Sequence, residues 1–401
     1  MNDNYKNLII LGNGFDIHLG LPTRWSDFVE FYEIIVNGSF EKFRLIKPKE
    51  WSFENFKKNG SKWINVDNVE SYFFYALENA KDDEKETYKK EVASFVNGLR
   101  NCKMLKLLSS LKQNNNGYMN FSWSDFEHLI EEILDSVDEY VENLLNKSHC
   151  AEVSVFMNDL LRQTIEKLEY KDEKYFSISY QVDDFNLKTD VINSKNKFLD
   201  FIFNELINFT LVYKKYIDLI VDKLIQNHLL NMFCTESSLI LTFNYTQDVD
   251  LFVNANDKLY VHGKANKDII IGISNDQEKE ERIKFSKNYM RVYNRVIDKD
   301  NKDNINQINK YISSHIFNHY YFLGHSLDKI DHSFLRQLFR GNDDYAKTKT
   351  TIFYYTEDDM QKKILNLYLM LGEKYMSLML NYGCLEFVHF SELEHYDFNK
   401  S

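Results

Sequence analysis

The first residues of this sequence that could take part in chemistry form a glycine turn after an apolar run. Leu8-Ile9-Ile10-Leu11 precedes Gly12-Asn13-Gly14, and Asp16 follows. This order predicts a buried strand that leads through a tight turn into a helix. Such a turn lets the backbone approach a phosphate closely. The third glycine of the usual dinucleotide fingerprint is absent, because Ile17 stands there, so a plain strand-to-helix connection fits equally well.

Three downstream segments also place a polar side chain where a strand-like run ends. Asn244 follows residues 238–243, His262 follows residues 258–261, and Gly324 with Ser326 ends an aromatic run. Histidine is the natural general base near neutral pH. Each segment also has an ordinary structural explanation, as a turn-forming Asn, a structural His or a helix-capping Ser. Because parallel strands end at one edge of a sheet, a single crevice would collect all four segments.

Strand-like and helical patterns alternate around these segments. We expect strands at residues 7–12, 238–243, 258–261, 268–273, 320–324, 350–355 and 385–390. Residues 66–235 instead carry amphipathic helical patterns. The expected fold class is α/β, with a Rossmann-like, mostly parallel sheet and a large α-helical insertion. Residues 1–65 and 236–401 would form the discontinuous nucleotide-binding domain, and residues 66–235 the helical insertion domain.

Composition limits the classes of function. The chain has 401 residues and a formal net charge of −12, which argues against loose binding to nucleic acid. Its four cysteines lie far apart without a C-x-x-C pair, a pattern that suits free thiols in a reducing cytosol. We find no targeting segment and no stretch of membrane-spanning length. We therefore expect a cytoplasmic protein that binds neither a membrane nor nucleic acid.

The motifs together resemble the AbiH family of bacterial abortive-infection proteins, which act against phages. The resemblance rests on residues 12–16 with 20–23, 123–127, 243–246 and 262–263, and on 324–328 with Asp331. It implies that the chain is an anti-phage effector.

The same order of motifs is similar to the sirtuin-like NAD-binding fold. This similarity assigns NAD contacts to residues at the turn and at the fourth segment: Gly12, Asn13, Gly14, Pro22, Gly324 and Ser326. Asp16, which replaces the small Ser of that fold's turn, and Thr23 are further candidates for contacting NAD. The similarity makes His262 the general base, with Asn244 orienting the attacking water and the ribose. The paired cysteines of the deacetylase zinc module are absent. The similarity therefore implies cleavage of NAD between nicotinamide and ribose, without a metal, rather than deacetylation.

Two other functions stay open. One is a non-catalytic nucleotide sensor whose helical insertion binds a phage component or a partner protein. The other is a metal-dependent nuclease that uses the carboxylates Asp16, Asp125, Glu127, Asp328 and Asp331. The expected partners are NAD or a related dinucleotide, a phage protein or other protein as trigger, and further copies of the chain in a homo-oligomer.

Overall fold

The fold is built around a parallel sheet. The computed structural model describes residues 6–19, 21–37, 82–114, 123–146, 158–171, 176, 188–222, 238–247, 257–265, 267, 269–273, 280–287, 289–290, 317–340, 348–396 and 398. Its strands are β1 (Asn7–Leu11), β2 (Ser238–Thr242), β3 (Asp257–Tyr260), β4 (His319–Leu323), β5 (Lys349–Tyr354) and β6 (Leu385–His389).

The strand order is β3-β2-β1-β4-β5-β6, and every neighbouring pair is parallel. This is the doubly-wound order of dinucleotide-binding folds. It confirms the expected Rossmann-like α/β class. The direction of strand succession reverses between β1 and β4, and ligands of such sheets bind at this switch point, beyond the carboxyl ends of the strands.

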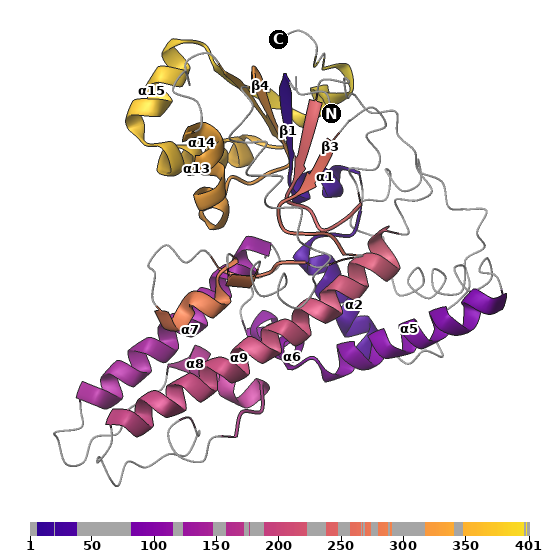
Figure 1. Ribbon diagram of the computed structural model, residues 1–401, viewed down its shortest axis with the longest axis vertical. Helices are drawn as coiled ribbons and strands as arrows, with labels where there is room; N and C mark the ends of the chain where they lie inside the picture. The colour runs from indigo at the N-terminus through magenta and orange to yellow at the C-terminus, as the bar shows by residue number, and fades with distance from the viewer. Residues whose placement is uncertain are drawn as a thin grey trace.

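Helices occupy two regions of the molecule (Figure 1). Among the described residues between β1 and β2, the helices are α1 (Asn13–His18), α2 (Trp25–Asn37), α5 (Asp82–Asn101), α6 (Lys103–Asn114), α7 (Trp123–Asn146), α8 (Asp159–Lys167) and α9 (Lys188–Tyr216). Helix α9 continues as a π-helical turn, η5 (Ile217–Val221). Later in the chain come η7 (Glu280–Phe285), η9 (Lys329–Asp331), α13 (His332–Arg340), α14 (Glu357–Leu371), α15 (Glu373–Asn381) and η10 (Phe390–His395). Helices α5–α9 lie together in one half of Figure 1, and the sheet with α13–α15 lies in the other.

Strand β1 is buried on both faces because its side chains alternate between two hydrophobic cores. Leu8 and Ile10 pack in one core with residues of α13, α14 and α15. Ile9 and Leu11 belong to the other core, which continues into α2, α7 and α9. Helix-rich segments on both sides therefore fix the central strand.

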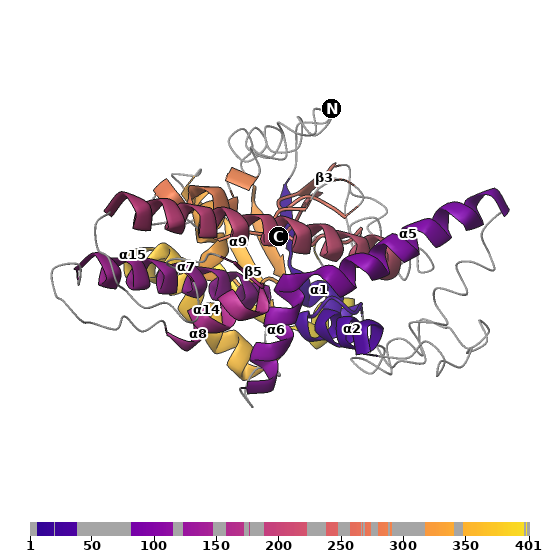
Figure 2. The ribbon, with the colours of Figure 1, turned by 90° about the horizontal axis from the view of Figure 1, so that it is seen from below.

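The second core joins the end of β1 to the helical region. Trp25 of α2 stacks on Phe126 of α7 with ring centroids 4.9 Å apart, and Phe28 contacts Tyr213 of α9 at 5.1 Å. Helices α7 and α9 also lie side by side in the view from below (Figure 2). The first turn of α7 is thereby held close to the carboxyl edge of the sheet. The division into a domain of residues 1–65 and 236–401 and an insertion of residues 66–235 stays a prediction.

One expected strand is wrong. Of residues 268–273, those that the structure describes form only isolated bridges, Gly263 with Ile269 and Ile273 with Ser286. The segment folds back onto the turn after β3, since the Ile270 N–H donates to the His262 carbonyl at 2.8 Å. Within the described residues, no helix is both long and apolar enough to cross a membrane. Cys102 and Cys384 are buried, whereas the other two cysteines lie outside these residues.

Candidate functional site

The site begins where the turn after β1 packs against the end of β4. The Gly12 N–H donates to the Leu323 carbonyl at 3.0 Å, and the Gly14 N–H donates to the Gly324 carbonyl at 2.9 Å. A Cβ on Gly12 would lie 2.5 Å from the His325 Cα, and one on Gly14 would lie 2.7 Å from the Gly324 oxygen. Close approach of the two strand ends therefore requires glycine at both positions, whatever ligand the turn binds.

Gly324 completes this junction. Its φ is +68°, a left-handed conformation that favours glycine, and a Cβ there would lie 2.0 Å from the Phe15 nitrogen. From the sequence, we expect these glycines to let a phosphate approach the backbone. In the structure, the N–H groups of Gly12 and Gly14 bond to the carbonyls of Leu323, the last residue of β4, and of Gly324 after it. A direct contact of the glycine turn with a ligand stays a prediction.

A cavity of about 290 Å³ opens at this junction, near the lower end of the range for small-molecule sites. It is lined by all the predicted site residues except Pro22: Gly12, Asn13, Gly14, Asp16, Thr23, Asn244, His262, Gly324 and Ser326. The Pro22 carbonyl instead accepts a hydrogen bond from the Tyr216 hydroxyl of α9 at 2.7 Å. The structure thus brings together four segments that are far apart in the sequence.

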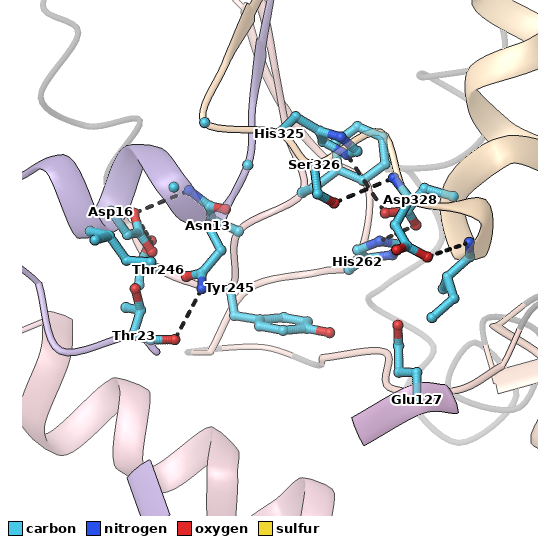
Figure 3. A pocket seen from close by; sticks show the side chains of 18 of the residues that line it. Asn13, Asp16, Thr23, Glu127, Tyr245, Thr246, His262, His325, Ser326 and Asp328 are labelled. Atoms are coloured by element: carbon cyan, nitrogen blue, oxygen red, sulfur yellow. Dashed lines mark hydrogen bonds and ion pairs between the residues drawn. The ribbon is translucent and has the colours of Figure 1, made fainter. Parts of the chain in front are cut away.

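One side of the cavity is built around Asp16 (Figure 3). The Asp16 side chain is 1% exposed. Its carboxylate accepts hydrogen bonds from the Asn244 amide at 3.1 Å and from the Thr246 hydroxyl at 2.9 Å. The Asn13 amide donates to the Thr23 carbonyl at 3.2 Å, which fixes the turn beside it. Asn244, at the end of β2, therefore holds a buried carboxylate in place.

The opposite side is built around His262 (Figure 3). Its Nε2 lies 3.1 Å from Asp331 Oδ1. A neutral His262 therefore carries its proton on Nε2 and donates it to the carboxylate, which makes Nδ1 the basic nitrogen. Asp331 is positioned by the short helix η9. This is the arrangement in which a carboxylate orients a histidine base and stabilises its protonated form.

Lys287 joins this pair to the helical region. Its Nζ lies 3.1 Å from Asp331 Oδ1 and 3.1 Å from Glu127 Oε2 of α7. Burial opposes a charge on Asp331, but Lys287 and His262 outweigh it and hold the pKa of Asp331 well below its usual value. Burial likewise disfavours the charged Lys287, yet Asp331 and Glu127 raise its pKa. Burial raises the pKa of Glu127 to about 7, although Lys287 opposes this shift.

A second histidine faces Asp331. Burial lowers the pKa of His325 to about 4, so its imidazole is neutral at pH 7. Its Nδ1 accepts a hydrogen bond from the Leu327 N–H at 2.9 Å, which places the proton on Nε2. That nitrogen lies 3.6 Å from Asp331 Oδ2. Asp331 is thus surrounded by cationic and N–H groups.

Ser326 and Asp328 follow the end of β4 and accept hydrogen bonds from nearby backbone N–H groups. The Ser326 hydroxyl accepts from the Asp328 N–H at 3.3 Å, and Asp328 accepts from the Ile330 N–H at 3.3 Å. Asp328 also lies 3.2 Å from Nε2 of His128 in α7. Hydrogen bonds to Asp328 and then Glu131 raise the pKa of His128 to about 9. Asp328 therefore caps η9, whereas the Ser326 hydroxyl bonds within the turn before it, and both residues also line the cavity.

Sequence reasoning missed several residues that line the cavity. Tyr355 donates its hydroxyl proton to the Gly14 carbonyl, and Lys363 lies 2.6 Å from Asp359. Tyr355 and Asp359 lie at and just beyond the end of a predicted strand, so the strand-end pattern could have found them. Lys287 carries no comparable signal. Asp331 and Glu127 appeared only in the family motifs and among the nuclease carboxylates.

The cavity is rich in carboxylates. Its acidic lining residues are Asp16, Glu127, Asp328, Asp331 and Asp359, and its lysines are Lys287 and Lys363. Each of the two lysines is bound to a carboxylate. Among the described residues, no group of three or more His, Cys, Asp and Glu is arranged to hold a metal ion. The side chain of Asp125 lies outside these residues.

The strand order and the position of the cavity define a doubly-wound α/β protein with a ligand site at its topological switch point. A family model described as bacteriophage abortive infection AbiH matches residues 8–355, which include all four strand-end segments. The chain belongs to this AbiH family. Neither a curated protein nor a solved structure matches the chain significantly. The similarity to the sirtuin-like fold stays a prediction.

Proposed function

We propose that this AbiH protein is an anti-phage effector that hydrolyses NAD at the bond between nicotinamide and ribose C1′. The observation that carries the proposal is the pair of His262 and Asp331, 3.1 Å apart, in a cavity at the switch point of the sheet. A histidine whose Nε2 is bound to a carboxylate has Nδ1 as the nitrogen that accepts a proton, and Nδ1 of His262 is buried. Dinucleotides bind sheets of this strand order at the same place.

The reaction would proceed by attack of one water molecule on C1′. The C1′–N bond breaks, and its electron pair neutralises the positively charged nicotinamide ring. A bond forms between C1′ and the water oxygen, and the water proton passes to Nδ1 of His262. The products are nicotinamide and ADP-ribose, and His262 later releases its proton to solvent. No general acid is required because the leaving group departs as a neutral molecule.

The charges around the cavity support this chemistry. The substrate's nicotinamide ring is cationic, and the transition state develops positive charge at the ribose. A buried carboxylate favours both, since electrostatic interactions strengthen when water is excluded. Asp16, fixed by Asn244 and Thr246, is suited to this role. Asn244 then acts by holding Asp16, in addition to the predicted contacts with water and ribose.

NAD as the substrate, a protein trigger and a homo-oligomeric assembly are also part of the proposed function. NAD is favoured over NADP because no basic side chain marked a site for a 2′-phosphate in the sequence. The reaction would take place in the cytoplasm, and the effector would be controlled by a phage or partner protein and by assembly into a homo-oligomer.

Release of nicotinamide from NAD, measured with and without EDTA, tests the proposal. A well-placed general base contributes about 10²–10⁴-fold, so His262→Ala should reduce turnover by about that factor. EDTA should have no effect. His319→Ala is the matched control, because His319 is also a buried histidine but lies at the opposite end of β4, bonded to Thr351. It should retain turnover wherever it remains folded.

The remaining outcomes would refute hydrolysis as proposed. Turnover that survives in His262→Ala would remove the base from its assigned residue. Turnover abolished by EDTA would favour a metal-dependent enzyme. Binding of NAD without nicotinamide release, in the presence of phage-infected cell extract as a source of trigger, would favour the nucleotide-sensing module.

A further inference from the structure

A buried lysine lies between the helical region and the proposed base. Lys287 contacts Glu127 of α7 on one side and Asp331 of η9 on the other, each at 3.1 Å. The exposed fractions of these three side chains are 9%, 8% and 16%. A buried charge is costly unless it is paired, so this cluster of one cation and two anions holds its members firmly together.

The backbone fixes Lys287 in this place. Its N–H donates to the Ile273 carbonyl at 3.0 Å, and the Ile273 N–H donates to the Phe285 carbonyl at 2.9 Å. A Cβ on Gly272 would lie 2.5 Å from the Phe285 oxygen, so glycine permits this close contact. The Gly272 N–H also donates to Glu127 Oε1 at 3.3 Å. Glu127 therefore contacts both the lysine and the segment that carries it.

We propose that Lys287 and Glu127 are a positioning pair that orients Asp331 and sets how readily His262 accepts a proton. The inference rests on the proposed function, in which His262 is the base. Through this pair, the helical region contributes to the catalytic centre by way of Asp331, although both side chains also line the cavity. Among the described residues, the charged and titratable groups that face His262 and its carboxylate include Asp331 and Asp328, His325, Lys287, Glu127 and Tyr245.

Lys287 and the protonated form of His262 both bind the Asp331 carboxylate, so the two cations share the stabilisation that its negative charge provides. A carboxylate bound only to His262 would stabilise the imidazolium fully. Lys287 takes part of that stabilisation and adds a positive charge nearby, so it makes protonation of His262 harder. Glu127 in turn draws Lys287 away from Asp331. The two residues therefore act on His262 in opposite directions, although both belong to one ion-pair cluster.

Titration of His262 by NMR tests this pair without relying on turnover. The protein is labelled with ¹³C at the imidazole ε1 carbon, and the His262 signal is assigned by its loss in His262→Gln. Lys287→Met should raise the pKa of His262 by about one unit, and Glu127→Gln should lower it by about half a unit. Lys287→Arg, which keeps the charge, should restore a value near that of the wild type.

A matched control separates this effect from general destabilisation. Lys195→Met removes another buried lysine, which pairs with Asp138 at 2.9 Å within the helical region. It should leave the His262 titration unchanged. Shifts of opposite sign for Lys287→Met and Glu127→Gln support the proposal. Shifts of the same sign, or none in either variant, overturn it, even if NAD hydrolysis holds. Opposite shifts in a protein that does not hydrolyse NAD would refute the proposed function alone.

Discussion

The junction between β1 and β4 gives a sharp test of how this fold builds its site. Gly324 has a φ of +68°, and a Cβ there would lie 2.0 Å from the Phe15 nitrogen and 2.5 Å from the Gly14 carbonyl carbon. All of these neighbours are backbone atoms, which cannot move aside as a flexible side chain can. Gly324→Ala should therefore push the turn after β1 away from the end of β4.

Gly383 provides the matched control. Its φ is +63°, and a Cβ there would meet nothing within 4 Å. Left-handed backbone costs a residue with a Cβ about 1–2 kcal/mol, and replacing glycine by alanine gains about 0.4–1 kcal/mol through the unfolded state. Gly383→Ala should thus lower the free energy of unfolding by about 1 kcal/mol. Gly324→Ala has the same backbone cost and also overpacks the junction, which costs about 1–3 kcal/mol more. Its free energy of unfolding should therefore fall by about 2–4 kcal/mol in total.

Urea unfolding followed by far-UV circular dichroism measures the difference between the two variants. Hydrogen exchange at the amides of residues 12–15 adds a local readout, since the Gly14 N–H bonds to the Gly324 carbonyl. We expect faster exchange there in Gly324→Ala and no change in Gly383→Ala. Equal losses of stability in both variants, within about 0.5 kcal/mol, would show that close packing at this junction is not what requires glycine.

Two further predictions concern charged groups at the edge of the cavity. Asp16→Asn should lower kcat for NAD hydrolysis by about 10²–10³-fold with little change in KM, because it removes a charge that acts on the transition state. The control is Asp222→Asn, because Asp222 is a buried carboxylate outside the cavity lining that accepts a hydrogen bond from the Gln247 N–H. A raised KM at unchanged kcat in Asp16→Asn would contradict the role assigned to Asp16. The raised pKa of His128, about 9, means that its ion pair with Asp328 stabilises the fold fully below pH 6.5 and is lost as pH rises through 9. Between pH 6.5 and 9, the free energy of unfolding of the wild type, measured by urea titration, should fall by about 1–2 kcal/mol, allowing for solvent screening. An equal fall with pH in His128→Gln would show that the His128–Asp328 ion pair is not its cause.

Local patterns in the sequence predicted much of the site. Apolar runs of about four to six residues that end in Gly, Asn or His mark buried parallel strands and their carboxyl ends. For this reason the sequence predicts Asp16, Asn244, His262 and Ser326, all of which line the cavity. The strand expected at residues 268–273 was wrong because an apolar run alone does not tell whether a neighbouring sheet edge is available to it.

Other parts of the site depend on contacts between distant segments. Lys287 is an ordinary lysine in the sequence, and only its position between Glu127 and Asp331 gives it a role. The pairing of Nε2 of His262 with Asp331 likewise follows from how η9 sits against the end of β3. Neither contact has a periodicity or a composition that a single sequence could reveal.

The sequence alone determined that this protein has a parallel α/β sheet with polar groups at its strand ends, because hydrophobic periodicity and glycine act within a few residues. Only the tertiary structure decided that β1 lies between β2 and β4, and hence which strand ends share a cavity. It also decided that Gly12 and Gly14 pack against Gly324 and its neighbour His325. Strand order depends on the free energy of burying side chains that are hundreds of residues apart in the sequence. A local sequence pattern therefore does not predict which strands become neighbours.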